Sequence, residues 1–232
     1  MRQGRRRRSP RSKILRVSCI LFDLDGTLYE SPAYSKQLES EILCYVSGRL
    51  QLGEAETKAL LNQRRRELGT LTSALQSLRI DRNAFFETMA DRIEPSLYIS
   101  KDCEVRETIR ALRGRGFKIG LVSNSGRPLV VKILDAIGLE SRLFDIIVTS
   151  TEAEPKPSPQ PFLLAVNTIG CKTSEIAYVG DREAAEIRPA KRSGLKTILL
   201  QRDKGTATTC ADSEVRRICE LPRLVRLRSS PR

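Results

Sequence analysis

The sequence contains no histidine. This absence excludes every mechanism that needs a histidine base or a histidine metal ligand, including Ser-His-Asp hydrolysis and histidine-ligated zinc. An enzyme made from this chain must therefore work with Asp, Glu, Lys, Ser, Thr, Cys or Tyr. Long apolar runs are also missing, so we expect no membrane span. No apolar segment of the kind found in secretory signal peptides follows the basic N-terminus.

The cysteines are scattered along the sequence and form no recognisable spacing motif. Six occur, and no two have the Cys-x-x-Cys separation. Cys19 and Cys44 fall among apolar neighbours, as buried thiols do. Without a secretory signal, this usage favours a reducing environment over a disulfide framework. The sequence therefore predicts a cytoplasmic protein.

Positive charge is concentrated at the two ends of the chain, whose net charge is +13. Residues 1–16 contain eight Lys or Arg, residues 221–232 contain four, and neither segment has an acid. Removing these twelve from the 41 basic residues leaves 29 against 28 acidic residues in 17–220. Such blocks are usually solvated and disordered. We expect basic tails at 1–16 and 222–232, which could bind nucleic acid through its phosphates.

The 232 residues suffice for one medium domain with an insertion. Between residues 34 and 93 the pattern is helical throughout. Leu38, Ile42, Val46 and Leu50 recur at the four-residue spacing of an amphipathic helix. Two further helices are expected at 56–69 and 81–93. We therefore expect a helical insertion at 31–94.

Strands and helices alternate through the rest of the chain. A buried strand is expected at 17–23 before the insertion. After it come strands at 117–124, 144–150, 175–181 and 196–200, separated by helices at 104–116, 127–138, 161–170 and 183–194. Such alternation predicts right-handed crossovers and a parallel sheet covered on both faces. The predicted fold class is α/β, a doubly wound, Rossmann-like core formed by 17–30 and 95–221 and carrying the helical cap 31–94.

Polar residues stand where the predicted strands end, which is the edge at which doubly wound sheets bind ligands. Asp23 and Asp25 end the first strand, Ser123 the second, and Asp181 the strand 175–181, while Lys156 lies in a proline-rich loop. Aligned carboxylates without histidine favour a hard cation, most often Mg²⁺. A lysine suits a phosphate, and a carboxylate beside both can act as a nucleophile.

These residues resemble the motifs of the haloacid dehalogenase-like hydrolase superfamily, in the family's order and over about 17–221. "DLDGTL" matches the first motif, with Asp23 as nucleophile and Asp25 as general acid and base. "LVSN" matches the second, with Ser123 binding phosphoryl oxygens. Lys156 matches the third and "VGDREAAEI", with Asp181, the fourth. The paired acids of the first motif favour phosphoryl transfer, because the dehalogenases lack the second Asp.

The resemblance also implies the binding groups. Phosphate would be held by Thr27, Ser123, Asn124 and Lys156. Mg²⁺ would be held by Asp23, Asp181 and the backbone carbonyl of Asp25. The fourth motif usually has a second Asp five residues after the first, and here that position is Glu186. Glu186 is expected to act from outside the metal's own ligands, on Lys156 or a metal-bound water.

The implied function is a Mg²⁺-dependent phosphatase that hydrolyses a small phosphorylated metabolite through an aspartyl-phosphate. The cap at 31–94 would choose the substrate, leaving nucleotides, sugar phosphates and phosphoglycolate open. Two other functions stay open. One is a phosphomutase on the same scaffold. The other is a nucleic-acid-binding protein that uses its basic tails, with no contact expected through the core. No membrane partner is expected, and the sequence does not indicate an oligomeric state.

Overall fold

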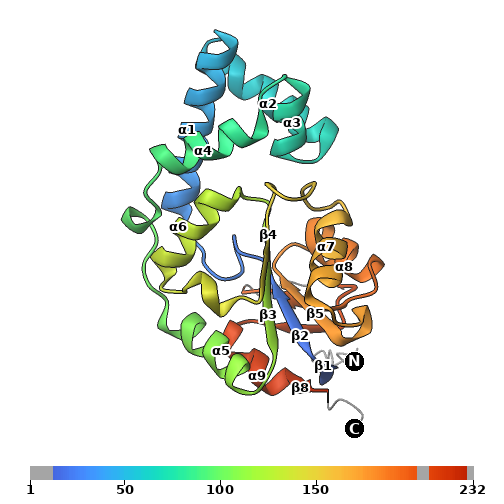
Figure 1. The fold of residues 1–232 in the computed structure, drawn as a ribbon. Coiled ribbons are helices and arrows are strands. Elements are labelled where there is room, and N and C mark those ends of the chain that lie inside the picture. Colours follow the sequence, from blue (N-terminus) through green and yellow to red (C-terminus); the bar gives the residue numbers. More distant parts are fainter. Residues whose placement is uncertain (1–12, 203–208, 229–232) are drawn as a thin grey trace, which may run out of the picture.

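A computed structural model describes residues 13–202 and 209–228 of the chain. Its centre is a six-stranded sheet, ordered β4-β3-β2-β5-β6-β7, in which all neighbours are parallel (Figure 1). The strands are β2 (Cys19–Phe22), β3 (Lys118–Val122), β4 (Ile146–Val148), β5 (Ile176–Gly180), β6 (Lys196–Leu200) and β7 (Ser213–Val215). The predicted doubly wound α/β fold is confirmed, with β2 as a central strand.

Helices cover both faces of the sheet. In Figure 1, α5 (Cys103–Gly114) and α6 (Arg127–Ile137) lie to the left of the sheet, and α7 (Gln160–Ile169) and α8 (Arg188–Arg192) to the right. Each side has its own apolar core. Short turns complete the connections: η1 (Pro95–Leu97), η2 (Ser141–Leu143), η3 (Thr173–Glu175), a π-helical turn η4 (Glu183–Ile187), η5 (Ile218–Glu220) and the helix α9 (Leu221–Leu224).

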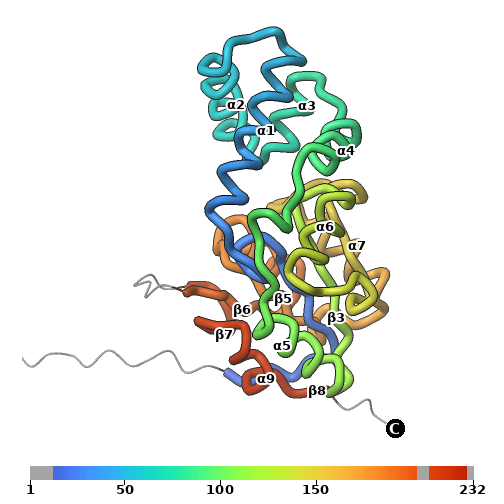
Figure 2. Tube along the Cα trace, turned by 90° about the vertical axis from the view of Figure 1, so that its left-hand side faces the viewer, coloured from blue at the N-terminus to red at the C-terminus, as the bar shows by residue number. Residues whose placement is uncertain are grey.

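Four helices stand beyond the carboxyl ends of the strands (Figures 1 and 2). They are α1 (Pro32–Leu50), α2 (Glu54–Leu68), α3 (Leu71–Ser77) and α4 (Arg82–Arg92). Polar caps fix three of their starts, since Ser31, Thr70 and Asp81 each accept a hydrogen bond from a backbone N–H of the first turn. All four lie inside the segment 31–94, whose assignment as a cap remains a prediction.

The helical segment rests on the core through α4 and α6. Phe86 of α4 packs so closely on Gly126, which caps α6, that a Cβ there would lie 2.2 Å from the ring. Lys132 donates a 2.6 Å hydrogen bond to the Ala90 carbonyl. These contacts hold the four helices over the end of the sheet where the polar residues gather.

Parts of both predicted tails are folded. Strands β1 (Leu15–Val17) and β8 (Val225–Leu227) pair in parallel and form a second, two-stranded sheet. This sheet lies at the end of the molecule opposite the cap (Figure 1). Leu15, Val17 and Val225 are buried. Counting charge alone missed the alternation of apolar and basic residues in these segments, which is typical of half-buried strands. The predictions of disorder and of nucleic-acid binding concern residues 1–12 and 229–232. These residues lie outside the described part of the chain.

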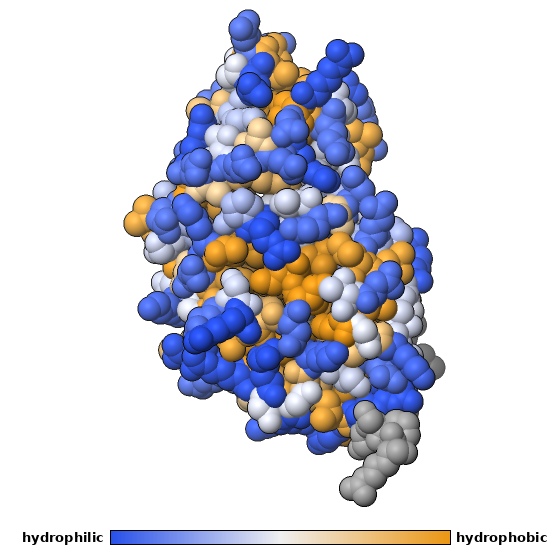
Figure 3. All heavy atoms as spheres, viewed as in Figure 1, coloured by the Kyte–Doolittle hydropathy of each residue, from blue (hydrophilic) through white to orange (hydrophobic). Residues whose placement is uncertain are grey.

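The surface over β4 is partly apolar. Figure 3, which has the view of Figure 1, shows apolar residues between α6 and α7. The flanking helices expose Val131 on α6 and Leu163 and Leu164 on α7. Among the described helices, none is both long enough and apolar enough to cross a lipid bilayer.

Candidate active site

The pairing register of the parallel strands brings the predicted site residues to one edge of the sheet. Phe22, the last residue of β2, is level with Leu121 of β3 and Val179 of β5. Asp23 follows β2 directly, as Ser123 follows β3 and Asp181 follows β5. The backbone N–H groups of Asp23 and Ser123 continue the ladder to the carbonyls of Val179 (2.9 Å) and Val148 (3.0 Å). Three polar side chains therefore leave neighbouring strands at one edge.

Lys156 is the buried centre of this edge. Its ammonium forms an ion pair with Asp23 Oδ1 and donates to the Val122 carbonyl (3.0 Å) and the Tyr178 hydroxyl (2.9 Å). Glu186 Oε1 lies 3.4 Å away. With no solvent-exposed side-chain surface, the ammonium must find all its partners within the protein. It holds one oxygen of Asp23 in place.

Asn124 positions the loop that carries Lys156. Its carboxamide accepts from the Lys156 N–H (2.8 Å) and donates to the Lys156 carbonyl (2.9 Å). These paired bonds fix the backbone of Lys156 relative to the end of β3. The phosphate contact that the sequence suggested for Asn124 stays a prediction, and the side chain already has this structural role.

Asp25 is oriented separately from Asp23. The Tyr29 hydroxyl donates to its Oδ1, while Ser125 (3.2 Å) and Ser123 (3.4 Å) donate to its Oδ2. The carboxylate thus lies beside Ser123, on the side of the cavity beneath the cap. Donors on both oxygens restrict the side chain to one orientation, as a proton-transfer group requires.

The turn after Asp25 approaches the opposite side of the site. Gly26 has φ +86°, and a Cβ there would lie 2.4 Å from Asp181 Oδ2, so glycine is required for both conformation and space. Thr27 is buried, and its hydroxyl has no partner among the described residues. Arg202 donates to the carbonyls of Gly26 and Thr27 and so fastens this turn to the end of β6.

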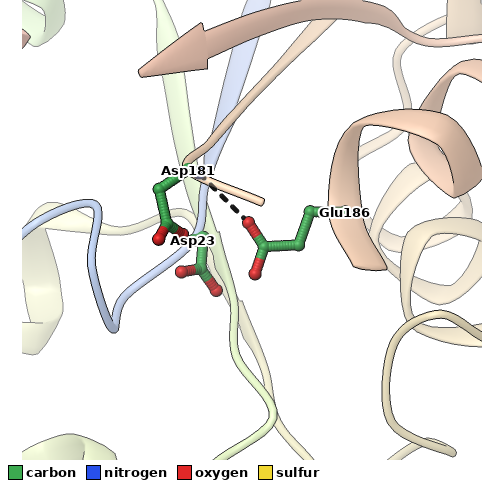
Figure 4. A group of neighbouring side chains, drawn as sticks. All are labelled: Asp23, Asp181 and Glu186. Carbon is green, nitrogen blue, oxygen red and sulfur yellow. Dashed lines mark hydrogen bonds between the residues drawn. The ribbon is translucent and has the colours of Figure 1, made fainter. Parts of the chain in front are cut away.

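Three carboxylates meet beneath this turn. Asp23, Asp181 and Glu186 bring carboxylate oxygens within 4.8 Å of one another (Figure 4). Asp23 Oδ2 and Asp181 Oδ1 are buried without hydrogen-bond partners among the described residues. Such open carboxylate oxygens, with no histidine or thiol in the group, suit Mg²⁺ rather than a softer metal. The residues present therefore fit the predicted ion. The backbone carbonyl of Asp25 as a further ligand stays a prediction.

Glu186 differs from these two because donors surround both of its oxygens. Oε2 accepts from the N–H groups of Asp181 (3.2 Å) and Arg182 (3.3 Å). Oε1 accepts from the Arg182 guanidinium (2.7 and 3.0 Å) and faces Lys156. Space for this side chain depends on Gly180, where a Cβ would lie 2.5 Å from Oε2. These contacts match the expected supporting role better than a direct metal bond.

Burial changes the acidity of the two open carboxylates. It raises the pKa of Asp23 to about 8. Glu186 and Asp25 add to this rise in pKa, and Lys156 opposes it. Burial also raises the pKa of Asp181 to about 6, with Glu186 adding and Arg182 opposing. The positive charge present is thus too small for all the carboxylates of the site.

Lys156 and Arg182 stabilise the ionised form of Glu186. Burial by itself would raise the pKa of Glu186, but Lys156 and Arg182 outweigh it and hold that pKa below its ordinary value. For Lys156, burial alone would lower the pKa, but Asp23 and Glu186 reverse the effect and raise it. Glu186, Lys156 and Arg182 are therefore charged at neutral pH.

A cavity of about 260 Å³ opens between this edge and the cap. Asp25, Asn124, Ser125, Lys156 and Arg182 contribute polar groups from the core. The cap contributes mostly apolar side chains, together with polar ones from α2 and the segment that follows it. A small substrate could enter here and reach Asp25, while Asp23 is buried behind this lining.

Sequence reasoning missed four contributors to the site: Tyr29, Ser125, Tyr178 and Arg182. Tyr178 left a usable signal, because a tyrosine in a fully buried strand needs a partner for its hydroxyl. Arg182 is adjacent to Asp181 in the fourth motif, so its sequence position could have indicated a contact with Glu186. Tyr29 and Ser125 meet Asp25 only because turns bring them there, and no spacing rule predicts this.

Replacing Glu186 with Gln is expected to weaken Mg²⁺ binding about 10–100-fold, the range for partners that support metal ligands. The amide keeps the shape but loses the charge that holds Lys156 and the Arg182 guanidinium in place beside the metal-binding carboxylates. Isothermal titration with Mg²⁺ measures the change in Kd. Glu183→Gln, on the same turn but paired with Arg188 (3.1 Å), is the matched control. An unchanged Kd for Glu186→Gln would show that its charge does not act on the ion.

Comparisons with known proteins agree with this site. A family model described as haloacid dehalogenase-like hydrolase matches residues 20–200. The chain is 33% identical over 195 residues to a phosphoglycolate phosphatase of Aquifex aeolicus, covering 78% of this chain and 83% of the relative. It is 28% identical over 206 residues to a glyceraldehyde 3-phosphate phosphatase of Methanopyrus kandleri, covering 81% and 85%.

A solved structure shares the fold. The crystal structure of a HAD phosphatase from Thermococcus onnurineus has a TM-score of 0.66 and 22% sequence identity, covering 89% of this chain and 97% of that one. The family match runs from β2 to β6 and so spans every strand end described above. By sequence as well as by architecture, this chain belongs to the haloacid dehalogenase-like hydrolases, as its motifs predicted.

Proposed function

We propose that this protein is a Mg²⁺-dependent phosphatase that hydrolyses a small phosphomonoester through an aspartyl-phosphate on Asp23. That the chain is a hydrolase of phosphate esters follows from its family and its relatives. We propose in addition the nucleophile, the metal and the size of the substrate.

The position of Asp23 carries the proposal. One of its oxygens is held by the Lys156 ammonium, and the other has no partner among the described residues. A buried carboxylate of this kind is fixed in direction and able to attack. In the first step, an Asp23 oxygen forms a bond to phosphorus while the bond from phosphorus to the ester oxygen breaks. Asp25 gives its proton to the departing oxygen.

In the second step, water attacks the phosphorus of the aspartyl-phosphate. Asp25, now ionised, takes the proton of that water, and the Asp23 carboxylate is released together with inorganic phosphate. Ser123 and Thr27 supply hydroxyls to the phosphoryl oxygens, and Lys156 offsets negative charge from its place beside Asp23. Tyr29 and Ser125 keep Asp25 in place through both proton transfers.

Mg²⁺ would be held by Asp23 and Asp181, with the Asp25 carbonyl, and supported by Glu186. When bound, it offsets the negative charge of the phosphoryl group and the carboxylates, which lets them approach. The high pKa of Asp23 supports this assignment, since the site needs more positive charge to ionise its nucleophile.

Substrate size follows from the cavity of about 260 Å³, which suits a small metabolite. The named substrates of the two relatives, phosphoglycolate and glyceraldehyde 3-phosphate, are of this size. Six free thiols support the predicted cytoplasmic location.

The test is phosphate release by the purified protein from a panel of phosphomonoesters. The panel contains phosphoglycolate, glyceraldehyde 3-phosphate and p-nitrophenyl phosphate, each assayed with Mg²⁺ and with EDTA. Release from at least one substrate, lost in EDTA and restored by Mg²⁺, is expected. Absence of release from every substrate in Mg²⁺, or equal release in EDTA, would contradict the proposal.

A further inference from the structure

The cap places a single guanidinium at the cavity above the catalytic edge. Arg65 of α2 lines the cavity of about 260 Å³ and also a neighbouring one of about 220 Å³. The two cavities share Asp25 from the core and Arg65, Leu38 and Ile42 from the cap. Arg65 and Asp25 therefore face the same space from the two parts of the molecule.

Arg65 has no acidic partner within the described residues, because no carboxylate there lies within 4.0 Å of its guanidinium. Its neighbours on α2 differ. Arg64 pairs with Glu67 at 3.1 Å, and Lys58, which lines the second cavity, pairs with Glu39 at 3.3 Å. Arg66 has no such pair either, but it lines neither cavity. Arg65 alone on α2 presents uncompensated positive charge to the substrate space.

Apolar side chains form the larger part of the lining that surrounds Arg65 and Asp25, beside hydroxyls of Thr70, Thr72 and Ser125. Side chains of the cap and of α6 form these apolar walls: Leu38, Ile42, Phe85, Phe86, Met89 and Leu129. Such walls favour a short carbon segment over a heavily hydroxylated one. A guanidinium beyond them matches a carboxylate or a phosphate, which it binds through two parallel hydrogen bonds.

We propose that Arg65 selects substrates whose leaving group carries a second anionic group, joined by a short carbon segment to the phosphate ester. The ester lies at Asp23, the carbon segment lies along the apolar walls, and the second anion reaches Arg65. This inference rests on the proposed phosphatase function and names the substrate class of that site.

A matched substrate series tests it. Phosphate esters with two, three and four carbons are compared in three forms, ending in a hydroxyl, a carboxylate or a second phosphate. The wild type should prefer the anionic forms by kcat/KM. Arg65→Met should lower kcat/KM for these forms about 10–100-fold, mainly through KM, and change the hydroxyl forms less than about 3-fold. Arg65→Lys keeps the positive charge but cannot make two parallel hydrogen bonds to the anion. Its kcat/KM for the anionic forms should lie between those of the wild type and Arg65→Met.

Arg66→Met is the control and should alter none of the substrates. A response limited to one anionic series would identify carboxylate or phosphate as the recognised group, and either supports the inference. An equal loss on all three series, or no loss on any, would overturn it. If the wild type hydrolyses neither these esters nor p-nitrophenyl phosphate, the phosphatase function itself fails, and the selection by Arg65 fails with it.

Discussion

Replacing Asp23 with Asn is expected to reduce turnover on the order of 10⁴–10⁶-fold, as for the loss of a catalytic nucleophile. The amide fits the same volume and still reaches Lys156, but it has no negative charge with which to attack phosphorus. Phosphate release from the best substrate measures the effect. Circular dichroism and the melting temperature show whether the variant is folded.

The control is Asp135→Asn, the same chemical change at an exposed position of α6 far along the helix from Gly126. Its turnover should remain within about 2-fold, as is usual for surface changes away from a site. Turnover of Asp23→Asn within about 10-fold of the wild type would exclude the aspartyl-phosphate on this residue and require another nucleophile.

Mg²⁺ affinity should rise on the order of 100-fold between pH 6 and pH 9. The metal binds carboxylates in the ionised form, and the metal-free pKa of Asp23 is about 8. Burial raises this pKa, so Mg²⁺ must displace a proton from the Asp23 carboxyl wherever that carboxyl is still protonated. Isothermal titration in buffers of different ionisation enthalpy measures both Kd and the protons released, which should approach one per Mg²⁺ near pH 7.

The same pKa values predict how the stability of the metal-free protein depends on pH. Folding raises the pKa of Asp23 and of Asp181, so the folded state holds more protons than the unfolded chain between about pH 4 and pH 8. Stability therefore falls as pH rises through this range. The melting temperature without Mg²⁺ should be lower at pH 8.5 than at pH 5, and Mg²⁺ should restore it most at the higher pH. A pH-independent Kd and melting temperature would contradict both expectations.

Strand ends were the most predictable part of the site. Asp23, Ser123 and Asp181 each follow a buried apolar run, and parallel pairing leaves little choice about where such residues meet. Lys156 was predictable from its motif, but its burial against Tyr178 depends on contacts that residue spacing does not encode. The cap was predictable as helical and as the part that would choose the substrate, but the residue that does so was not, because helix periodicity does not show which of three consecutive arginines faces a cavity.

Charge counting was the weakest guide. It grouped residues 13–16 with the basic N-terminus and 222–228 with the basic C-terminus, although both contain apolar residues that the fold buries. Burial of Leu15 and Val225 decides the structure of these two segments, since Arg16 and Arg226 can remain in solvent while their neighbours face inward. Local charge density is a property of composition, whereas strand pairing depends on a distant partner that neither segment reveals by itself.

Pairing of β1 with β8 also sets an order of events during synthesis. A ribosome produces β1 before and β8 after all the other described strands, so Leu15 and Val17 have no strand partner until the roughly 200 residues that separate the two strands have been translated. At about 5–20 residues per second, this delay is on the order of tens of seconds. During it, β2 can join β3 and then β5, while the first strand of the chain remains open to chaperones. The catalytic edge can therefore assemble on the nascent chain before its opposite end is closed.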